Sequence, residues 1–183
     1  HRDLHSYPTR RSSDLLVQRV TQIGIYAFKD CSALTSVSIS NSITSISDNA
    51  FWGCSGLTSL TLPNGMTNIG RFAFYKCTGL TSLTIPSSVT SIGEHAFSYC
   101  TGLTSIKVES GNTVYDSRDN CNAVIETTSN TLVVGCKNST IPNSVTCIGD
   151  RSFSGCSGLT SITIPNGVTS IGEAAFGGCA ALS

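Results

Sequence analysis

The sequence contains little charge, few aromatic residues and no long apolar run. Of its 183 residues only 12% are charged, and 11 basic residues balance 11 acidic ones. A chain without a basic surface has no electrostatic footprint for nucleic-acid phosphates or for an acidic membrane. No apolar stretch approaches the roughly 18 residues that a membrane-spanning helix needs. We therefore expect neither a nucleic-acid partner nor membrane insertion in this fragment.

Groups that carry catalysis are equally scarce. Outside residues 1–15 the sequence has one histidine, His95, so no Ser-His-Asp or Cys-His set can be assembled. Asp116 and Asp119 lack the alternating spacing of a calcium loop, and a turn or a local partner for Arg118 is favoured over ion binding. The C-x-x-C spacing of a zinc site does not occur in the sequence. These observations predict a non-enzyme that uses no metal or cofactor.

Residues 1–15 share no pattern with the rest of the chain. The stretch Ser6 to Leu15 reads like an in-frame translation of a widely used sequencing adapter. We therefore treat residues 1–15 as an assembly artefact, expected to be disordered and outside the fold. Residues 16–183 are expected to form one domain that is truncated at both ends, because Cys179 to Ser183 opens a new repeat and stops.

What the sequence has in abundance is a 23-residue repeat, seen most cleanly from Cys77 to Tyr99. Such a period is the signature of a solenoid, whose stacked coils bury a continuous core. One coil cannot fold alone, because both flanks of its apolar side chains would stay in water. We expect a column of phenylalanines, one from each coil, to run through the core: Phe28, Phe51, Phe74, Phe97, Phe153 and Phe176.

Each coil is expected to contain one main strand, a corner and a short helical turn. Leu83 and Ile85 alternate with polar residues, which is the pattern of a strand with one buried face. Pro86 cannot donate to a strand ladder, so the strand should end there. Gly93 should allow a tight corner, and residues 94–99 should form a helical or 3₁₀ turn with Phe97 inside.

One repeat is remodelled. From Cys100 to Cys156 the chain is about ten residues longer than two repeats would be, and such insertions usually bulge from one flank of a solenoid. The irregular part, residues 109–140, contains NAVIETTSNTLVVG, which predicts a β-hairpin turning near Ser129. We expect this hairpin to leave the coil and rejoin its register at Ile141.

Six of the nine cysteines occupy the same repeat position. Their side chains would project in parallel from adjacent coils, whereas a disulfide needs converging Cβ vectors. Free, buried thiols are therefore expected for these six. Cys121 and Cys136 flank the predicted hairpin and would lie nearly opposite each other, so a disulfide between them is a hypothesis. Cys147 is expected to be a lone, partly exposed thiol.

The repeat CSGLTSITIPNGVTSIGEAAF, which starts at Cys156, resembles the BspA-like leucine-rich repeat over residues 16–183. The insertion resembles a variant repeat of Bacteroides and Prevotella members. The resemblance implies a right-handed, α/β to mostly β solenoid with a parallel sheet on its concave face. It also implies an adhesive module of a bacterial cell-surface or secreted protein, one that contacts host matrix proteins or other cells.

The candidate binding surface consists of hydroxyl side chains that point outward from the main strands, together with a few charged or aromatic residues. The partner is expected to be a protein or glycan on a host or microbial surface, bound by a monomer. Two alternatives stay open: a purely structural spacer that presents another domain, and a regular hydroxyl array for ice or polysaccharide. The candidate residues are Ser59, Thr61, Ser82, Thr84, Ser105, Lys107, Tyr115, Arg118, Ser161 and Thr163, with the hairpin tip at 127–130.

Overall fold

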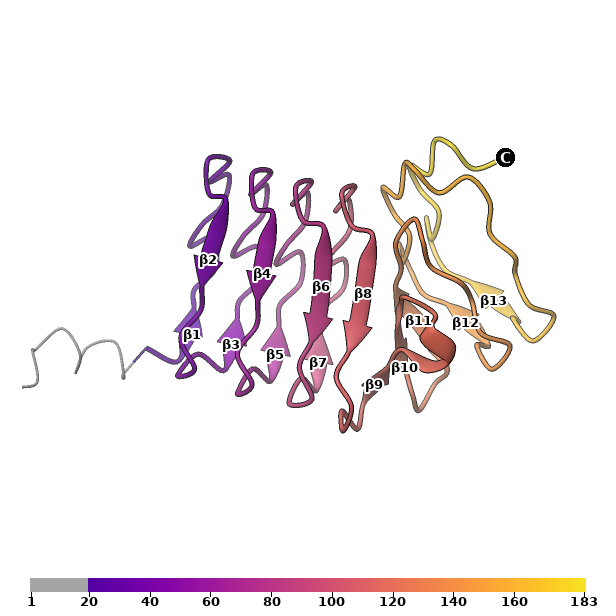
Figure 1. Cartoon of the computed structure of the whole chain (residues 1–183), viewed down its shortest axis with the longest axis horizontal. Coiled ribbons are helices and arrows are strands. Elements are labelled where there is room, and N and C mark those ends of the chain that lie inside the picture. The colour runs from indigo at the N-terminus through magenta and orange to yellow at the C-terminus, as the bar shows by residue number, and fades with distance from the viewer. Residues whose placement is uncertain (1–19) are drawn as a thin grey trace, which may run out of the picture.

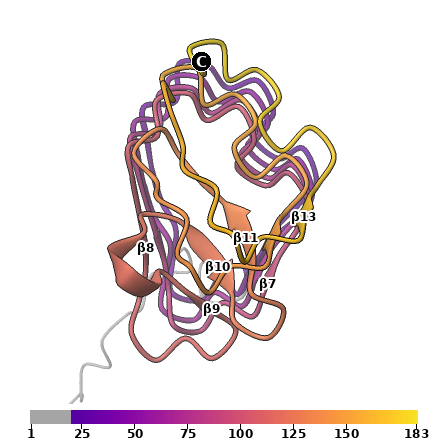
Figure 2. The ribbon, with the colours of Figure 1, turned by 90° about the vertical axis from the view of Figure 1, so that its right-hand side faces the viewer.

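The computed structural model describes residues 20–183, which form a solenoid of stacked coils (Figure 1). Seen from the end, successive coils superpose around one core (Figure 2). The predictions made for residues 1–15 concern a part of the chain outside this range. The repeat-based prediction of a mostly β, leucine-rich-repeat solenoid is confirmed.

Two sets of parallel strands run along the solenoid, one more than predicted. The long strands pair as β2 with β4 and β6 with β8, each with the equivalent strand of the next coil. The short strands of the VTSIG segment form a second sheet in the order β1-β3-β5-β7. The long strands are β2 (Ser36–Ser38), β4 (Ser59–Thr61), β6 (Ser82–Ile85) and β8 (Ser105–Val108), and the short strands are β1 (Gln22–Ile23), β3 (Ser45–Ile46), β5 (Asn68–Ile69) and β7 (Ser91–Ile92).

Strand β6 ends at Ile85, directly before Pro86, as predicted. The predicted helical turn at 94–99 is wrong, because this segment is a series of tight turns. His95 and Tyr99 have positive φ angles of 59° and 61°, which a right-handed helix cannot contain. Instead, the turn segments of adjacent coils hydrogen-bond to each other, for example from Phe74 N–H to the Ala96 carbonyl at 2.8 Å.

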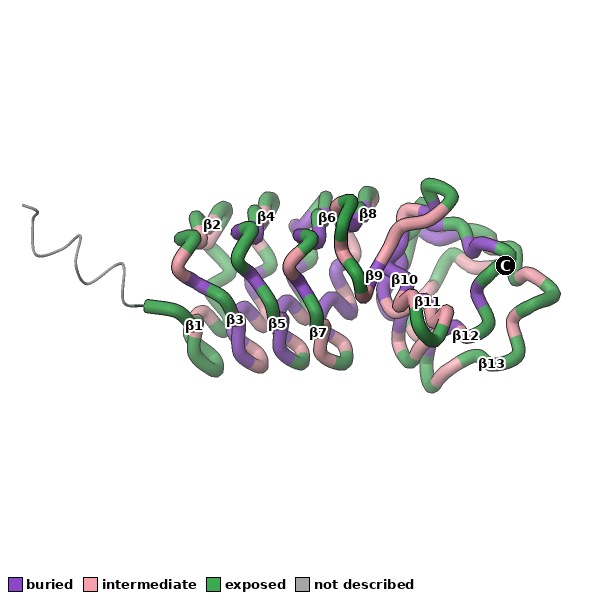
Figure 3. The backbone as a smooth tube through the Cα atoms, turned by 90° about the horizontal axis from the view of Figure 1, so that it is seen from below, coloured by how far each residue is buried: buried purple, intermediate pink, exposed green. Residues whose placement is uncertain are grey.

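The core lies between the two sets of strands and the turn segments, and exposed residues occupy the outer corners (Figure 3). The phenylalanine column is confirmed in two parts. Its rings are parallel from Phe28 to Phe97, with centroids 4.9, 5.1 and 5.3 Å apart, and stacking resumes between Phe153 and Phe176 at 5.1 Å. Between the two parts, the backbone of Gly135 lies against the ring of Phe153.

The remodelled repeat forms the predicted hairpin, β10 (Val124–Glu126) and β11 (Thr131–Val134). It does not bulge outward. Ile125 and Leu132 are fully buried, and β11 pairs in parallel with β12 (Cys147–Ile148), so the hairpin lies inside the stack (Figure 2). We call residues 124–134 the core hairpin. Its sheet has the order β13-β12-β11-β10-β9, with β9 (Tyr115–Asp116) and β13 (Ser170–Ile171) at the edges, and a 3₁₀ helix, η1 (Arg118–Asn120), follows β9.

The core hairpin stays inside because both of its faces are apolar. Val124 and Val134 belong to the hydrophobic cluster of the preceding coils, whereas Ile125 and Leu132 belong to the cluster of the following coils. Exposing either face would leave apolar surface in water, at about 25 cal/mol for each Å². The hairpin therefore replaces a coil as the wall between two parts of the core.

Candidate binding surfaces

The predicted hydroxyl face exists along the long strands β2 to β8. Ser59 lies in register with Ser36, and Thr61 with Ser38, and all four residues are exposed. The same alignment relates β6 to β8, where exposed Thr84 pairs with exposed Lys107. The residues of the face are Ser36, Ser38, Ser59, Thr61, Ser82, Thr84, Ser105 and Lys107, and the structure brings them together as two short columns.

Ser161 and Thr163 are exposed but do not extend these columns. The strand expected around Ile162 does not form, and a hollow of about 260 Å³ separates this segment from residues 139–141. The reason is that the remodelled repeat offers no long strand here as a pairing partner. Ile164 is consequently 42% exposed, although the repeat pattern predicts it to be buried.

Tyr115 does not lie on the surface, so its prediction as a contact residue is wrong. Its side chain is only 6% exposed, and its hydroxyl accepts a hydrogen bond from the Ile92 N–H at 3.0 Å. Burial raises the pKa of the phenol. Tyr115 is therefore a core residue that joins the remodelled repeat to the short strand β7.

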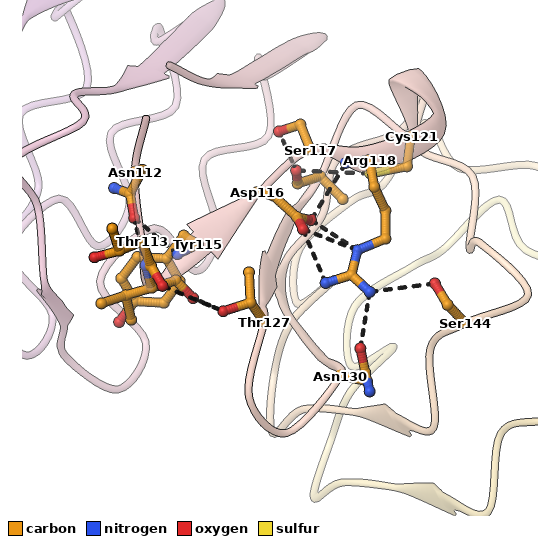
Figure 4. Close-up of polar contacts among 12 residues, drawn as sticks. Asn112, Thr113, Tyr115, Asp116, Ser117, Arg118, Cys121, Thr127, Asn130 and Ser144 are labelled. Atoms are coloured by element: carbon orange, nitrogen blue, oxygen red, sulfur yellow. Dashed lines mark hydrogen bonds and ion pairs between the residues drawn. The ribbon is translucent and has the colours of Figure 1, made fainter. Parts of the chain in front are cut away.

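Arg118 is held within the remodelled repeat and not presented for binding (Figure 4). Its guanidinium forms an ion pair with Asp116 at 2.8 Å, which raises the pKa of Arg118, and it donates to the Asn130 side chain at 2.8 Å. The predicted local pairing of Arg118 with an aspartate of YDSRDN is thus confirmed. Because Asn130 belongs to the hairpin tip, Arg118 fixes the tip. Charge reversal at Arg118 would disturb this structure as well as any binding.

The hypothesised disulfide between Cys121 and Cys136 is not formed, because both are free thiols. A β-bulge between Val124 and Ile125 shifts the hairpin register by one residue, so that Cys136 lies opposite Asn122 and contacts its amide at 3.3 Å. A one-residue slip turns a side chain to the other face of a sheet. Accordingly, Cys121 packs in one hydrophobic cluster and Cys136 in the other.

The six ladder cysteines are free, as predicted, but only four of them are buried: Cys31, in the first full coil, is exposed and Cys179, in the last, is partly exposed, because each lies near an end of the stack. Each buried thiol has a partner in the preceding coil: Cys77 donates to the Phe51 carbonyl and Cys100 to the Phe74 carbonyl, both at 3.2 Å. Burial raises the pKa of Cys100 to about 12. The buried thiols pack the coils together and are not nucleophiles.

A second surface, which the sequence analysis did not identify, runs along the turn segments. Trp52 lies 4.3 Å from Tyr75 and 5.5 Å from Phe72, measured between ring centroids. Phe72 in turn lies 4.9 Å from His95, and Tyr75 lies 5.4 Å from Tyr99. All are partly exposed. We call these residues, together with Tyr26, the aromatic ridge.

Cations border the aromatic ridge. The Lys29 ammonium lies 5.2 Å from the Tyr26 ring centroid and 6.0 Å from that of Trp52, and Lys76 lies 5.6 Å from Tyr75. These distances are within the range of cation–π attraction. The ridge therefore combines flat apolar faces with positive charge, a combination enriched at the centres of protein interfaces.

Four ridge side chains have backbone φ angles in the left-handed region that favours glycine or asparagine. Tyr99 has φ 61°, and Tyr26, Phe72 and His95, which share one repeat position, have φ angles of 59°, 54° and 59°. Asn49 occupies the same repeat position with φ 58°. A small polar residue thus fits this position with less strain, and three coils carry a large ring there instead.

The signal for the ridge is present in the sequence. When the repeats are aligned by their ladder cysteines, Tyr26, Phe72 and His95 fall in one column, and Lys29, Trp52 and Tyr75 in another. The residue at each of these positions varies from repeat to repeat, whereas the core was predicted from positions that are apolar in every repeat. Nothing in the described part of the chain groups three metal-ligating side chains, and no helix within residues 20–183 is long and apolar enough to cross a membrane.

Comparison with known proteins agrees with this architecture. The model of the BspA type leucine rich repeat region matches six copies, over residues 21–132 and 124–183. The chain belongs to the BspA-type leucine-rich repeat family. Proteins built from leucine-rich repeats of this type are typically non-catalytic binding proteins. No curated protein matches the chain.

Solved structures of bacterial leucine-rich repeat proteins are similar to this chain. A leucine rich cell surface protein from Faecalibacterium prausnitzii is 32% identical with a TM-score of 0.75, over 90% of this chain and 50% of that one. A leucine-rich repeat protein from Eubacterium ventriosum is 28% identical with a TM-score of 0.68, over 86% and 49%. The pneumococcal vaccine antigen PcpA, at 17% identity and a TM-score of 0.55, shares the fold alone. The chain thus spans about half the length of its first two relatives.

Proposed function

We propose that this chain is a non-catalytic binding module of a bacterial cell-surface or secreted protein, and that it contacts host matrix proteins or other cells through the aromatic ridge. The single observation that carries this proposal is the continuous contact among partly exposed rings from Trp52 to Tyr99. The family supports the binding role, and the Faecalibacterium relative is described as a cell-surface protein.

The ridge is a better binding surface than the hydroxyl face for energetic reasons. Tyrosine and tryptophan bury a large, rigid area and lose little conformational entropy, whereas serine and threonine hydroxyls exchange bonds with water at little net gain. Phe72 of the ridge has a left-handed backbone conformation, which costs of order 1–3 kcal/mol of conformational free energy for a residue with a large side chain. The same backbone occurs at this repeat position with Arg151 and Ala174, at φ 51° and 47°, so it belongs to the coil and each coil can carry a different side chain there.

The test compares two double variants against a panel of immobilised extracellular-matrix proteins and a glycan array. Trp52→Ala with Tyr75→Ala removes the centre of the ridge, and we expect binding to weaken at least about thirtyfold, as for loss of a hot spot. The matched control, Thr61→Ala with Thr84→Ala, changes two exposed hydroxyls and should leave affinity unchanged. Thermal unfolding of each variant checks that the solenoid remains folded.

Two outcomes would contradict the proposal in different ways. If the hydroxyl variant loses binding and the ridge variant does not, the partner docks on the long strands instead. If the intact chain binds nothing on the panel, the module is a spacer that presents another part of the protein. Charge reversal at Lys29 and Lys76 refines a positive result, because charges at an interface rim mainly change the association rate.

A further inference from the structure

Three turns of the solenoid have the sequence Pro-Asn followed by a small residue. They occupy the equivalent repeat position, at residues 63–66, 142–145 and 165–168. Each is closed by one hydrogen bond, from the N–H of its last residue to the carbonyl of its proline, at 2.9, 3.0 and 3.1 Å respectively. The asparagine and the residue after it are exposed in all three turns. Glycine follows the asparagine in the first and third turns, and serine in the second, so the three form a matched set.

The two turns with glycine leave the asparagine open to attack by the backbone. Asparagine is a thermolabile residue, because the backbone nitrogen of the next residue can displace its side-chain amide. Within the described residues, neither the Gly65 N–H nor the Gly167 N–H has a hydrogen-bond partner. Glycine has no Cβ to shield this nitrogen. In the second turn Ser144 carries a side chain, whose hydroxyl accepts a hydrogen bond from Arg118 at 3.4 Å.

The packing around the two glycine-containing turns differs. The turn at 63–66 has its first and last residues buried, and strand β4, which leads into it, pairs with β2. The turn at 165–168 has the same two positions only half-buried, and no strand forms before it. The asparagine must rotate out of the turn before its Cγ atom meets the glycine nitrogen. Such local opening costs less free energy where few buried contacts hold the backbone, so Asn166 is freer to react than Asn64.

We propose that Asn166 and, more slowly, Asn64 are sites of spontaneous deamidation, with water as the co-reactant. The glycine nitrogen loses its proton to a base in solvent and attacks the asparagine Cγ atom. The C–N bond of the side-chain amide breaks, ammonia leaves with a proton from solvent, and a succinimide ring closes. Water then adds to one ring carbonyl and breaks its bond to the glycine nitrogen. Addition at Cγ gives aspartate, whereas addition at the main-chain carbonyl gives isoaspartate, whose main chain continues through Cγ. Nothing is oxidised or reduced.

The products change the surface and the turn. Either one adds a carboxylate to a chain whose 11 basic and 11 acidic residues balance. Isoaspartate also adds one methylene to the main chain. In the turn at 63–66 this atom would displace Met66, which is fully buried, and overpacking of such a site is destabilising. In the turn at 165–168 the half-buried neighbours can move aside. The reaction is thus expected to be faster at the turn that tolerates it better.

The experiment incubates the intact, folded chain in mildly alkaline buffer and follows each asparagine by peptide mapping and mass spectrometry, in acid that stops the reaction. We expect Asn166 to lose its amide first, Asn64 to lose it more slowly and Asn143 to retain it. Electron-transfer fragmentation distinguishes isoaspartate from aspartate. Gly65→Ala should strongly slow the loss at Asn64 and leave the loss at Asn166 unchanged. The added Cβ fits, because its nearest neighbour is the Asn41 carbonyl oxygen at 3.4 Å.

The same incubation in guanidinium chloride removes the packing, so Asn64 and Asn166 should then react at closely similar rates. If neither residue loses its amide faster than Asn143 in the folded chain, the proposal is overturned. If Asn64 reacts as fast as Asn166 in the folded chain, packing of the turn does not control the reaction and the proposed order is wrong. None of these results bears on the aromatic ridge, whose residues lie outside the three turns.

Discussion

Regular coils and the remodelled repeat hold this solenoid together in different ways. In residues 31–108 many backbone contacts recur after one coil: Thr81 bonds to Thr58, and Thr104 to Thr81, through both backbone and hydroxyl. In the remodelled repeat the recurrence stops. The core hairpin offers a different apolar face to each neighbouring part, and Tyr99 bonds across it to Ser154.

The comparison shows what a coil must supply to its neighbours. Nearest-neighbour contacts dominate the stability of a solenoid, so any element that is apolar on both faces can stand in for a coil. The core hairpin meets this requirement through its buried Val124 and Ile125. It does not reproduce the turn segment, however, and a cavity of about 240 Å³, lined in part by His95 and Val133, lies beside it.

The largest expected effect comes from truncating a core ring in each region. Phe74 and Phe153 are both fully buried, and replacing either with alanine should cost about 3–5 kcal/mol of unfolding free energy. Phe74 stacks on rings at both sides, whereas Phe153 stacks only on Phe176 and the Gly135 backbone. Phe74→Ala should therefore cost about 0.5–1.5 kcal/mol more, the worth of one aromatic pair. Urea denaturation measures both, and equal losses would show that ring stacking adds nothing to burial.

The next effect tests whether Gly135 is required by the hairpin. A Cβ at residue 135 would overlap the Cε1 atom of Phe153, far inside a normal contact. Gly135→Ala should destabilise by about 1–3 kcal/mol through overpacking. Gly65→Ala, in a regular coil, is the control, since its nearest neighbour is the Asn41 carbonyl oxygen at 3.4 Å. In a Phe153→Ala background the cost of Gly135→Ala should largely vanish. If Gly135→Ala still destabilises the Phe153→Ala variant, the cost comes from the backbone conformation at residue 135 and not from a clash with the ring.

The sequence predicts the structure of the regular coils better than that of the remodelled repeat. The period, the end of β6 at Pro86 and the free ladder thiols follow from fixed positions that repeat many times. The short strands did not follow, because a pair such as Ser91 and Ile92 is too short to show a period of two. Their pairing depends on neighbours in the adjacent coils.

The remodelled repeat occurs once, so its sequence offers no internal control. Its hairpin was predicted, but its place inside the core was not. A symmetrical hairpin would set Cys121 opposite Cys136, and only the bulge at Val124 moves them apart. A bulge depends on packing against both faces at once, which local residue patterns do not encode. The aromatic ridge was missed because its residues occupy variable positions, whose pattern shows only when the repeats are aligned and compared column by column.

A smaller effect concerns His95, where the two regions meet. Burial, and next the Arg151 charge, lower its pKa; Arg71 acts in the same direction, and Glu94 and Asp150 oppose it. The unfolded chain therefore takes up this proton first as pH falls below about 6.5. Stability should be fully present above that pH and decline below it, because the unfolded state binds more protons. His95→Gln should remove this slope between about pH 6.5 and 5, where carboxylates remain largely ionised. An unchanged slope in urea midpoints would assign it to other groups.

The last prediction concerns the reactivity of the cysteine thiols in the two regions and involves no change in stability. At about pH 8 Cys31 should react with iodoacetamide, because its thiol is exposed. Cys54 and Cys100 should stay unlabelled in the folded chain, because burial raises their pKa to about 11 and about 12. Cys121 and Cys136 should also stay reduced in a glutathione-disulfide buffer, since they face different clusters. Peptide mapping distinguishes these cases. A Cys121–Cys136 cross-link would mean that the bulge slips and that the core hairpin samples the symmetrical register.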